Sequence, residues 1–189
     1  MKQAKVLTKE EFKRALAVVA QRRHADRNRL ALMLSHHAGL RVGEIASLKW
    51  SHLIDTSGQV RDDIRLGAAQ TKGGEARAVF VNTTLKREIR GYLGRLGEQP
   101  EGNHRVLRTQ KRYAFSANTL CQMFSELYAQ AGIDGATSHS GRRWFITKLA
   151  HAGISAKVIM TLAGHKHLST TQRYIDVNDE MLRAAVEVL

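Results

Sequence analysis

Four separated segments of this 189-residue chain carry basic side chains that can bind a phosphate group. The first contains Arg41, directly after Gly39 and Leu40, at the predicted start of a short helix whose free backbone N–H groups also favour an anion. Glu44 follows one helical turn later, where it can orient Arg41 through a local ion pair. Such arginines and ion pairs are common on protein surfaces, so this segment indicates a phosphate site only in combination with the others.

Lys72 and the pair formed by His139 and Arg142 belong to the second and third segments. Lys72 stands in a tight turn at residues 71–74, where a hairpin tip can reach into a DNA groove and a lysine can deliver a proton as well as a charge. His139 and Arg142 are three residues apart and would share one face of a helix, so both could bind one phosphate. The planar arginine fork can donate to two phosphate oxygens at once. The alternatives are a solvated turn lysine and a basic helix start that binds DNA without catalysis.

The fourth segment, residues 162–174, contains His165 and Tyr174. A polar turn and a Ser/Thr helix cap lie between them, and this arrangement can bring the phenol close to the imidazole. An isolated tyrosine is more often a packing residue than a nucleophile. The combination of all four segments is what favours a catalytic role for Tyr174 over packing.

The four segments together resemble the signature of the tyrosine recombinases, a family that includes phage integrases and Xer-type resolvases. The residues that carry this resemblance, in chain order, are Arg41, Lys72, His139, Arg142, His165 and Tyr174. The similarity extends over nearly the whole chain, from about Thr8 to Asp176. Gly141 and Arg143 depart from the family pattern, which more often has Leu and His at these positions.

The resemblance implies cleavage and rejoining of DNA strands through a 3′-phosphotyrosine intermediate. Tyr174 would attack the scissile phosphate and release a 5′-hydroxyl. Arg41 and Arg142 would neutralise the charge that grows on the non-bridging oxygens, with Glu44 orienting Arg41. Lys72 would protonate the departing 5′-oxygen.

Two histidines complete the implied site: His139 as general acid/base near the tyrosine, and His165 as a hydrogen-bond donor to the phosphate. The protein–DNA bond stores the energy of the cleaved bond, so rejoining would need neither ATP nor a metal ion. The sequence also contains no evident cluster of Asp and Glu of the two-metal kind. We therefore expect no cofactor and no metal site.

The charge of the chain also points to nucleic acid. Thirty Lys and Arg residues stand against 17 Asp and Glu, which gives a net charge of +13 that is spread along the sequence. Double-stranded DNA is the expected partner. The resemblance further implies a tetramer of copies of the chain on two DNA sites. A hydrophobic fraction of 43% without an apolar run of membrane-spanning length predicts a globular, cytoplasmic protein.

The elements that must position these residues are mostly helical. Thr8 and Glu11 form a predicted capping box that starts the first helix. Periodic apolar residues and caps predict further helices at 29–37, 42–48, 84–96, 116–131, 141–152, 155–163, 169–175 and 178–188. Residues 53–82 favour strands, among them 64–69 and 76–81. The fold class predicted is α+β, a mainly α-helical domain with a small three-stranded antiparallel sheet of the integrase-like kind.

We interpret residues 1–189 as one catalytic domain that lacks the N-terminal core-binding domain of full-length tyrosine recombinases. The last helix carries an apolar stripe that either packs on its own domain or passes to a neighbouring copy, two alternatives of equal weight. The residues of this stripe are Met181, Leu182, Ala185, Val186 and Leu189.

Two other functions compete with the recombinase interpretation. Residues 154–175 could form a helix–turn–helix that binds DNA without catalysis, with 169–175 as the recognition helix. A type IB topoisomerase or a telomere resolvase would use the same set of catalytic groups without pairing two DNA sites. A covalent protein–DNA adduct would exclude the first of these alternatives.

Overall fold

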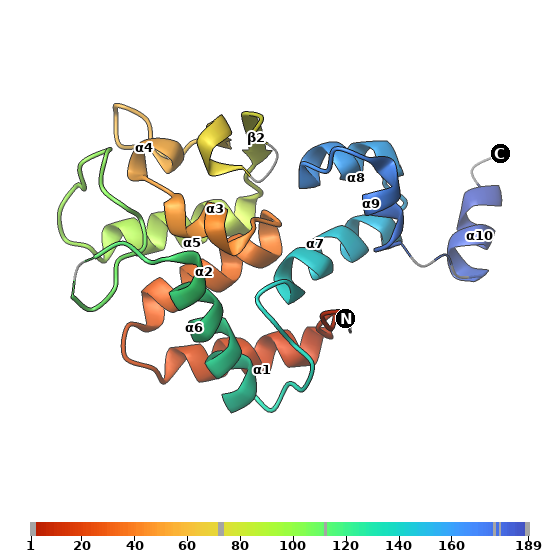
Figure 1. Cartoon of the computed structure of the whole chain (residues 1–189), viewed down its shortest axis with the longest axis horizontal. Helices are drawn as coiled ribbons and strands as arrows, with labels where there is room; N and C mark the ends of the chain where they lie inside the picture. The colour runs from red at the N-terminus through yellow and green to blue at the C-terminus, as the bar shows by residue number, and fades with distance from the viewer. Residues whose placement is uncertain (1–2, 72–73, 112, 176, 178, 188–189) are drawn as a thin grey trace.

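Helices form most of the structure, a computed structural model that describes residues 3–71, 74–111, 113–175, 177 and 179–187 (Figure 1). The helices are α1 (Lys9–Ala20), α2 (Ala25–His37), α3 (Val42–Ser47), α4 (Trp50–Leu53), the 3-10 helix η1 (Ala68–Gln70), α5 (Thr83–Gly94), α6 (Ala117–Gln130), α7 (Ser140–His151), α8 (Ala156–Ala163), α9 (Leu168–Gln172) and α10 (Asp179–Val186). Strands β1 (Asp63–Leu66) and β2 (Arg77–Phe80) pair antiparallel, with Ile64 opposite Val79. No helix among the described residues is both long enough and apolar enough to span a membrane.

Side-chain caps explain where several helices begin. The Thr8 hydroxyl accepts a hydrogen bond from the Glu11 N–H at 3.1 Å, and the Glu11 carboxylate accepts one from the Thr8 N–H at 2.9 Å. This reciprocal pair is the predicted capping box. Asn82, Ser116 and Ser155 cap α5, α6 and α8 in the same way, each through a side-chain oxygen that accepts from the backbone three residues later.

The buried apolar side chains form two clusters. The larger cluster joins α1 to α6 with the sheet. The smaller cluster joins α7 and α8 through Ile146, Ala150, Ile159 and Ala163, with the Tyr174 ring packed against it. Figure 1 shows α7, α8 and α9 beside the larger body and α10 standing apart at the end of the chain. The residues with candidate chemistry come from both clusters, so the contact between the clusters decides their arrangement.

Gly141 lets the two clusters approach closely. A Cβ atom at this position would lie 2.2 Å from the Ser35 hydroxyl and 2.7 Å from Nδ1 of His36, both on α2. The leucine that tyrosine recombinases more often have here would not fit against α2. The departure at Gly141 therefore reflects unusually close packing of α7 on α2.

The sheet differs from the sequence prediction, because two strands rather than three are present among the described residues. The segment expected to supply the third strand makes a single isolated bridge, between Ile54 and Val60. The Asp55 carboxylate accepts hydrogen bonds from the backbone N–H groups of Ser57 and Gln59 and closes a tight turn. This turn takes up the residues that a paired strand would need.

Helix α9 is shorter than predicted and ends at Gln172, so Tyr174 follows the helix instead of lying on it. The Tyr174 N–H donates to the Thr171 carbonyl at 2.9 Å, and the Ile175 N–H donates to the Gln172 carbonyl at 3.1 Å. These bonds span three residues, so the chain tightens into a turn after the helix. Lys72, for which the sequence predicted a turn, and Asn178, at the predicted start of the last helix, lie outside the described residues.

Candidate active site

The C-terminal end of α8 is where the basic side chains meet. A helix end leaves carbonyl groups without helical partners, and it carries the negative end of the helix dipole. Arginines from three other elements donate to three successive carbonyls there. Arg77 Nη1 donates to the Leu162 carbonyl at 3.0 Å. Arg142 Nη2 donates to the Ala163 carbonyl, and Arg41 Nη2 contacts the Gly164 carbonyl at 3.4 Å.

Gly164 gives the helix end the geometry that this arrangement needs. Its φ of +63° is the left-handed conformation that ends many helices at a glycine. The next residue turns back, so the His165 N–H donates to the Met160 carbonyl at 3.0 Å. The carbonyls of residues 162–164 consequently remain available to the arginines.

Glu44 forms ion pairs with two of these arginines. Its side chain is 1% exposed and pairs with Arg41 Nη1 at 3.0 Å and with Arg77 Nη2 at 2.9 Å. The same carboxylate accepts a hydrogen bond from the Arg41 backbone N–H at 2.8 Å. Glu44 thus holds the Arg41 guanidinium in one orientation and links it to Arg77.

Arg142 is buried between the two clusters, with 3% of the residue exposed. Its Nη1 donates to the Gly39 carbonyl at 2.6 Å, and its Nη2 donates to the Ala163 carbonyl. Burial, followed by repulsion from Arg41, lowers the pKa of Arg142 to about 9, so it remains a cation at neutral pH. A buried cation with fixed orientation is a strong anchor for an anion.

His165 lies beside these arginines and is 9% exposed. Its Nδ1 shares a hydrogen bond of 2.9 Å with the hydroxyl of Thr171, which is fully buried. Burial, with repulsion from Arg142 and Arg41, lowers the pKa of His165 to about 4. The imidazole is therefore neutral at pH 7.

The Tyr174 ring stacks on the His165 ring, with centroids 5.7 Å apart and planes inclined by 24°. The guanidinium of Arg143 lies 5.4 Å from the centre of the same tyrosine ring, in a cation–π contact. The Thr147 hydroxyl donates to the Tyr174 carbonyl at 3.4 Å. Arg143, at the second departure from the family pattern, thus helps to hold the tyrosine.

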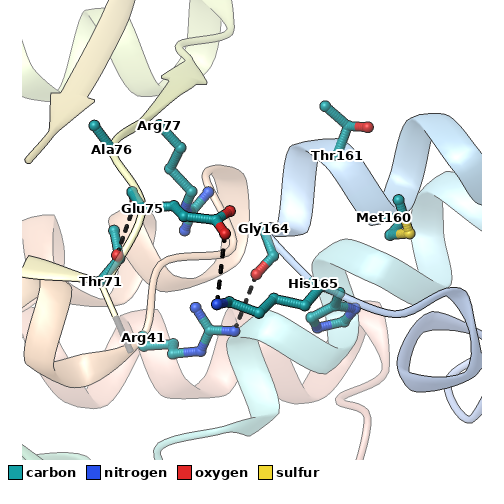
Figure 2. Close-up of a pocket in the computed structure, with 10 residues that line it drawn as sticks. Arg41, Thr71, Glu75, Ala76, Arg77, Met160, Thr161, Gly164 and His165 are labelled. Carbon is teal, nitrogen blue, oxygen red and sulfur yellow. Dashed lines mark hydrogen bonds and ion pairs between the residues drawn. The ribbon is translucent and has the colours of Figure 1, made fainter. Parts of the chain in front are cut away.

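Two neighbouring hollows are lined in part by predicted site residues. The first, here called the arginine pocket, has Arg41, Arg77, Gly164 and His165 among its lining residues. Figure 2 shows Arg41 and Arg77 pointing toward Gly164, which comes from the opposite side of the pocket. The second hollow is lined by Gln3, Ala4, His139, Arg143, Thr170, Arg173 and Tyr174.

Neither His139 nor Lys72 is among the described residues that line the arginine pocket. His139 is exposed at the start of α7, so it shares the second hollow with Tyr174 but does not face the same way as buried Arg142. Lys72 lies outside the described residues. Its neighbours Thr71 and Glu75 line the arginine pocket, where Glu75 pairs with Lys166 at 3.4 Å.

Arg77 belongs to the site although the sequence analysis did not single it out. The signal was its position in β2, two residues before buried Val79. Residues two apart in a strand lie on the same face, so Arg77 faces the interior. An arginine on the inner face of a strand needs buried acceptors, here Glu44 and the Leu162 carbonyl. The sequence analysis missed Thr171 as well. Its hydroxyl meets the His165 ring only because the chain turns between the two residues, and the sequence pattern does not specify that turn.

Comparison with known proteins identifies the family of the chain. Residues 5–181 match the model of the phage integrase family. The chain is 34% identical over 188 residues to tyrosine recombinase XerA of Thermococcus kodakarensis, covering 97% of this chain and 62% of the relative. It is 33% identical over 183 residues to XerA of Pyrococcus furiosus, covering 97% of this chain and 61% of the relative. The chain thus spans about three fifths of the length of these relatives.

Solved structures show the same fold. The crystal structure of XerA recombinase superposes with a TM-score of 0.76 at 24% identity, covering 98% of this chain and 63% of the other. The XerH site-specific recombinase in a post-cleavage complex gives a TM-score of 0.74 at 22% identity, covering 97% and 52%. From the family match and the XerA similarity, the chain belongs to the phage integrase family of tyrosine recombinases.

Proposed function

We propose that residues 1–189 are the catalytic part of a site-specific DNA recombinase that cuts and rejoins strands through Tyr174. One observation carries the proposal: the cations Arg41 and Arg142 and the neutral imidazole of His165 converge at the end of α8, directly beside the Tyr174 ring. Together they form a binding site for a phosphodiester next to a nucleophile.

In the cleavage step, the Tyr174 oxygen attacks phosphorus and passes its proton to His139, which shares the second hollow. The bond from phosphorus to the 5′-oxygen breaks, and that oxygen takes a proton from Lys72. The products are a 3′-phosphotyrosine and a free 5′-hydroxyl. A 5′-hydroxyl then attacks the phosphotyrosine and reverses each transfer, so the rejoining reaction consumes no cofactor.

The arginines and His165 stabilise charge during this step. Each guanidinium carries five N–H groups, so the carbonyls that anchor Arg41 and Arg142 leave further donors for the non-bridging oxygens. When the Thr171 hydroxyl donates to Nδ1 of His165, the proton of the neutral ring is on Nε2. That proton can then be donated to the phosphate.

Double-stranded DNA is the proposed substrate. The net charge of +13 favours a polyanion, and each neutralised phosphate releases counterions, so binding should weaken steeply with salt. XerH recombinase was solved bound to a difH substrate, and lambda integrase was solved as a dimer bound to a core site. We also infer a cytoplasmic location, since the proposed substrate is intracellular DNA.

Copies of the chain are proposed to act together on DNA, as a tetramer on two sites, with α10 as the exchanged element. Leu182 and Val186 on this helix are 56% and 67% exposed. Their exposure favours docking of α10 on a neighbouring copy over packing on its own domain. Ala185 is exposed too. The other members of the predicted stripe, Met181 and Leu189, are not among the side chains that the structure describes.

A trapped covalent adduct tests the proposal. The probe is a library of DNA duplexes with randomised sequence, each nicked just downstream of the candidate scissile phosphate, so that the short released fragment diffuses away and blocks rejoining. Denaturant-resistant adducts are captured in the presence of a chelator and sequenced. The wild type should form adducts, and Tyr174→Phe should form none. DNA binding without any adduct would favour a non-catalytic DNA-binding module instead.

A further inference from the structure

Arg77 crosses from the sheet to the end of α8. Its side chain is 13% exposed, and both terminal nitrogens are engaged, Nη2 with Glu44 at 2.9 Å and Nη1 with the Leu162 carbonyl at 3.0 Å. Figure 2 shows the side chain running from β2 toward Gly164. Both terminal nitrogens of Arg77 thus bind protein groups, one in the Glu44 ion pair and one at the end of α8, so Arg77 joins these two parts of the site.

The structure makes room for this side chain at one particular residue. A Cβ on Gly164 would lie 2.7 Å from both Cδ and Nε of Arg77. Gly164 therefore has two reasons to be glycine: its positive φ and the passage of Arg77 across it. The close approach indicates that Arg77 and the turn after α8 are packed as one unit.

We propose that Arg77 is a positioning residue for strand cleavage, a latch that fixes the Glu44 carboxylate and holds the end of α8 against the sheet. The inference rests on the proposed function, because the groups that the latch positions are Arg41 and His165. Glu44 orients the Arg41 guanidinium, and His165 directly follows the carbonyls that the arginines bind.

The two bonds of Arg77 explain why an arginine is needed. One Glu44 oxygen, Oε1, pairs with Arg41, while Oε2 is shared by Arg77 and the Arg41 backbone N–H. Without Arg77 the buried carboxylate loses one of its two cationic partners, and only Arg41 itself then fixes its orientation. A lysine donates all its hydrogen bonds from one nitrogen, so it cannot reproduce two bonds that leave from the separate Nη1 and Nη2 atoms of a rigid planar fork.

The first test compares Arg77→Met and Arg77→Lys with the matched control Arg65→Met. Arg65 lies on the paired strand β1, and its side chain is 72% exposed. The readout is the single-turnover rate of adduct formation at saturating concentrations of a duplex selected by wild type. Both Arg77 variants should be slower by about tenfold to hundredfold, the usual cost of a displaced catalytic group, whereas Arg65→Met keeps the wild-type rate.

Arg77→Lys also carries the test if Arg77→Met does not fold. A wild-type rate in either folded Arg77 variant would overturn the proposal. A second readout asks whether Arg77 works through Glu44. In a cycle with Glu44→Gln, the double variant should be no slower than the slower single variant. Rate losses that multiply independently would mean that Arg77 does not act through Glu44, and the latch would be refuted.

A third readout needs no DNA and separates this inference from the proposed function. The Gly164 and His165 amides are hydrogen-bonded to the Thr161 and Met160 carbonyls, so their hydrogen exchange reports on the end of α8. Arg77→Met or Arg77→Lys should speed exchange there by about tenfold or more, and Arg65→Met should not. Unchanged exchange refutes the latch. Absence of an adduct in the wild type would refute the proposed function. The hydrogen-exchange result would then test by itself whether Arg77 holds the end of α8.

Discussion

Replacing Gly141 by alanine is expected to destabilise the protein, although the same change in an ordinary helix stabilises it. Gly141 lies in the first turn of α7, packed on α2. The added methyl group would be 2.2 Å from the Ser35 hydroxyl, 2.7 Å from Nδ1 of His36 and 2.8 Å from Cβ of Ser35. Two of these three atoms belong to the short, buried side chain of Ser35, which cannot swing away, so α7 has to move away from α2.

The magnitude follows from two opposing effects. Alanine in place of glycine within a helix stabilises it by about 1 kcal/mol. Overpacking a well-packed contact costs about 3 kcal/mol at the upper end of its usual range, which applies here because the contacts are so short. The net loss is about 2 kcal/mol, which for a chain of this size lowers Tm by about 4–8 °C.

Thermal unfolding followed by circular dichroism measures this difference, with Gly91→Ala as the control. Gly91 is inside α5, where an added Cβ would make only ordinary contacts, the nearest at 3.5 Å to the flexible side chain of Arg95. That variant should be more stable than the wild type by about 0.5–1 kcal/mol. A Tm for Gly141→Ala equal to or above that of the wild type would refute the argument from close packing.

Three further predictions concern the site and the buried histidines. Arg142→Lys should slow adduct formation by about a hundredfold to a thousandfold, because a single ammonium nitrogen cannot reproduce the two bonds that leave from separate nitrogens of the planar guanidinium; a rate near that of the wild type would argue against preorganisation. Thr171→Val should slow the same reaction about fivefold to tenfold, the equivalent of one hydrogen bond of about 1 kcal/mol to His165, and an unchanged rate would contradict this. Burial lowers the pKa of His36 to about 3 and that of His165 to about 4. As the pH falls below about 6.5, these histidines become protonated in the unfolded chain but stay neutral in the folded protein, so the free energy of unfolding decreases. Urea unfolding should therefore show a loss of about 2 kcal/mol per histidine between pH 7 and pH 5, smaller in His36→Gln, and equal stability at the two pH values would contradict the assignment.

Local signals in the sequence were sufficient for much of the secondary structure. The capping box of Thr8 and Glu11 places the start of α1, and a cap by Ser155 starts α8 where the sequence predicted a helix. These elements were predictable because both partners of each capping bond lie within one turn of the chain. The proximity of Glu44 to Arg41 was predictable for the same reason, since three residues in a helix bring the two side chains together.

Non-local pairing was less accessible to sequence patterns. Strands were predicted between residues 53 and 82, yet only β1 and β2 pair among the described residues, and the segment around Asp55 forms a tight turn with one isolated bridge. Whether a residue with strand propensity pairs depends on an available neighbouring edge, which the segment itself does not reveal. The end of α9 before Tyr174 is similar, since contacts with α7 through Thr147 accompany the turn.

The amino-acid sequence by itself determined which chemical groups are present, their order along the chain and the local pairs that lie within one helical turn. The tertiary structure decided that Arg41, Arg77 and Arg142 share the end of α8, through bonds that join residues 123, 85 and 21 positions apart. It also decided that Arg142 is buried while His139 is exposed. The reason is physical: a carbonyl at a helix end attracts whichever donors the packed core brings near it, and that depends on how two separate clusters meet.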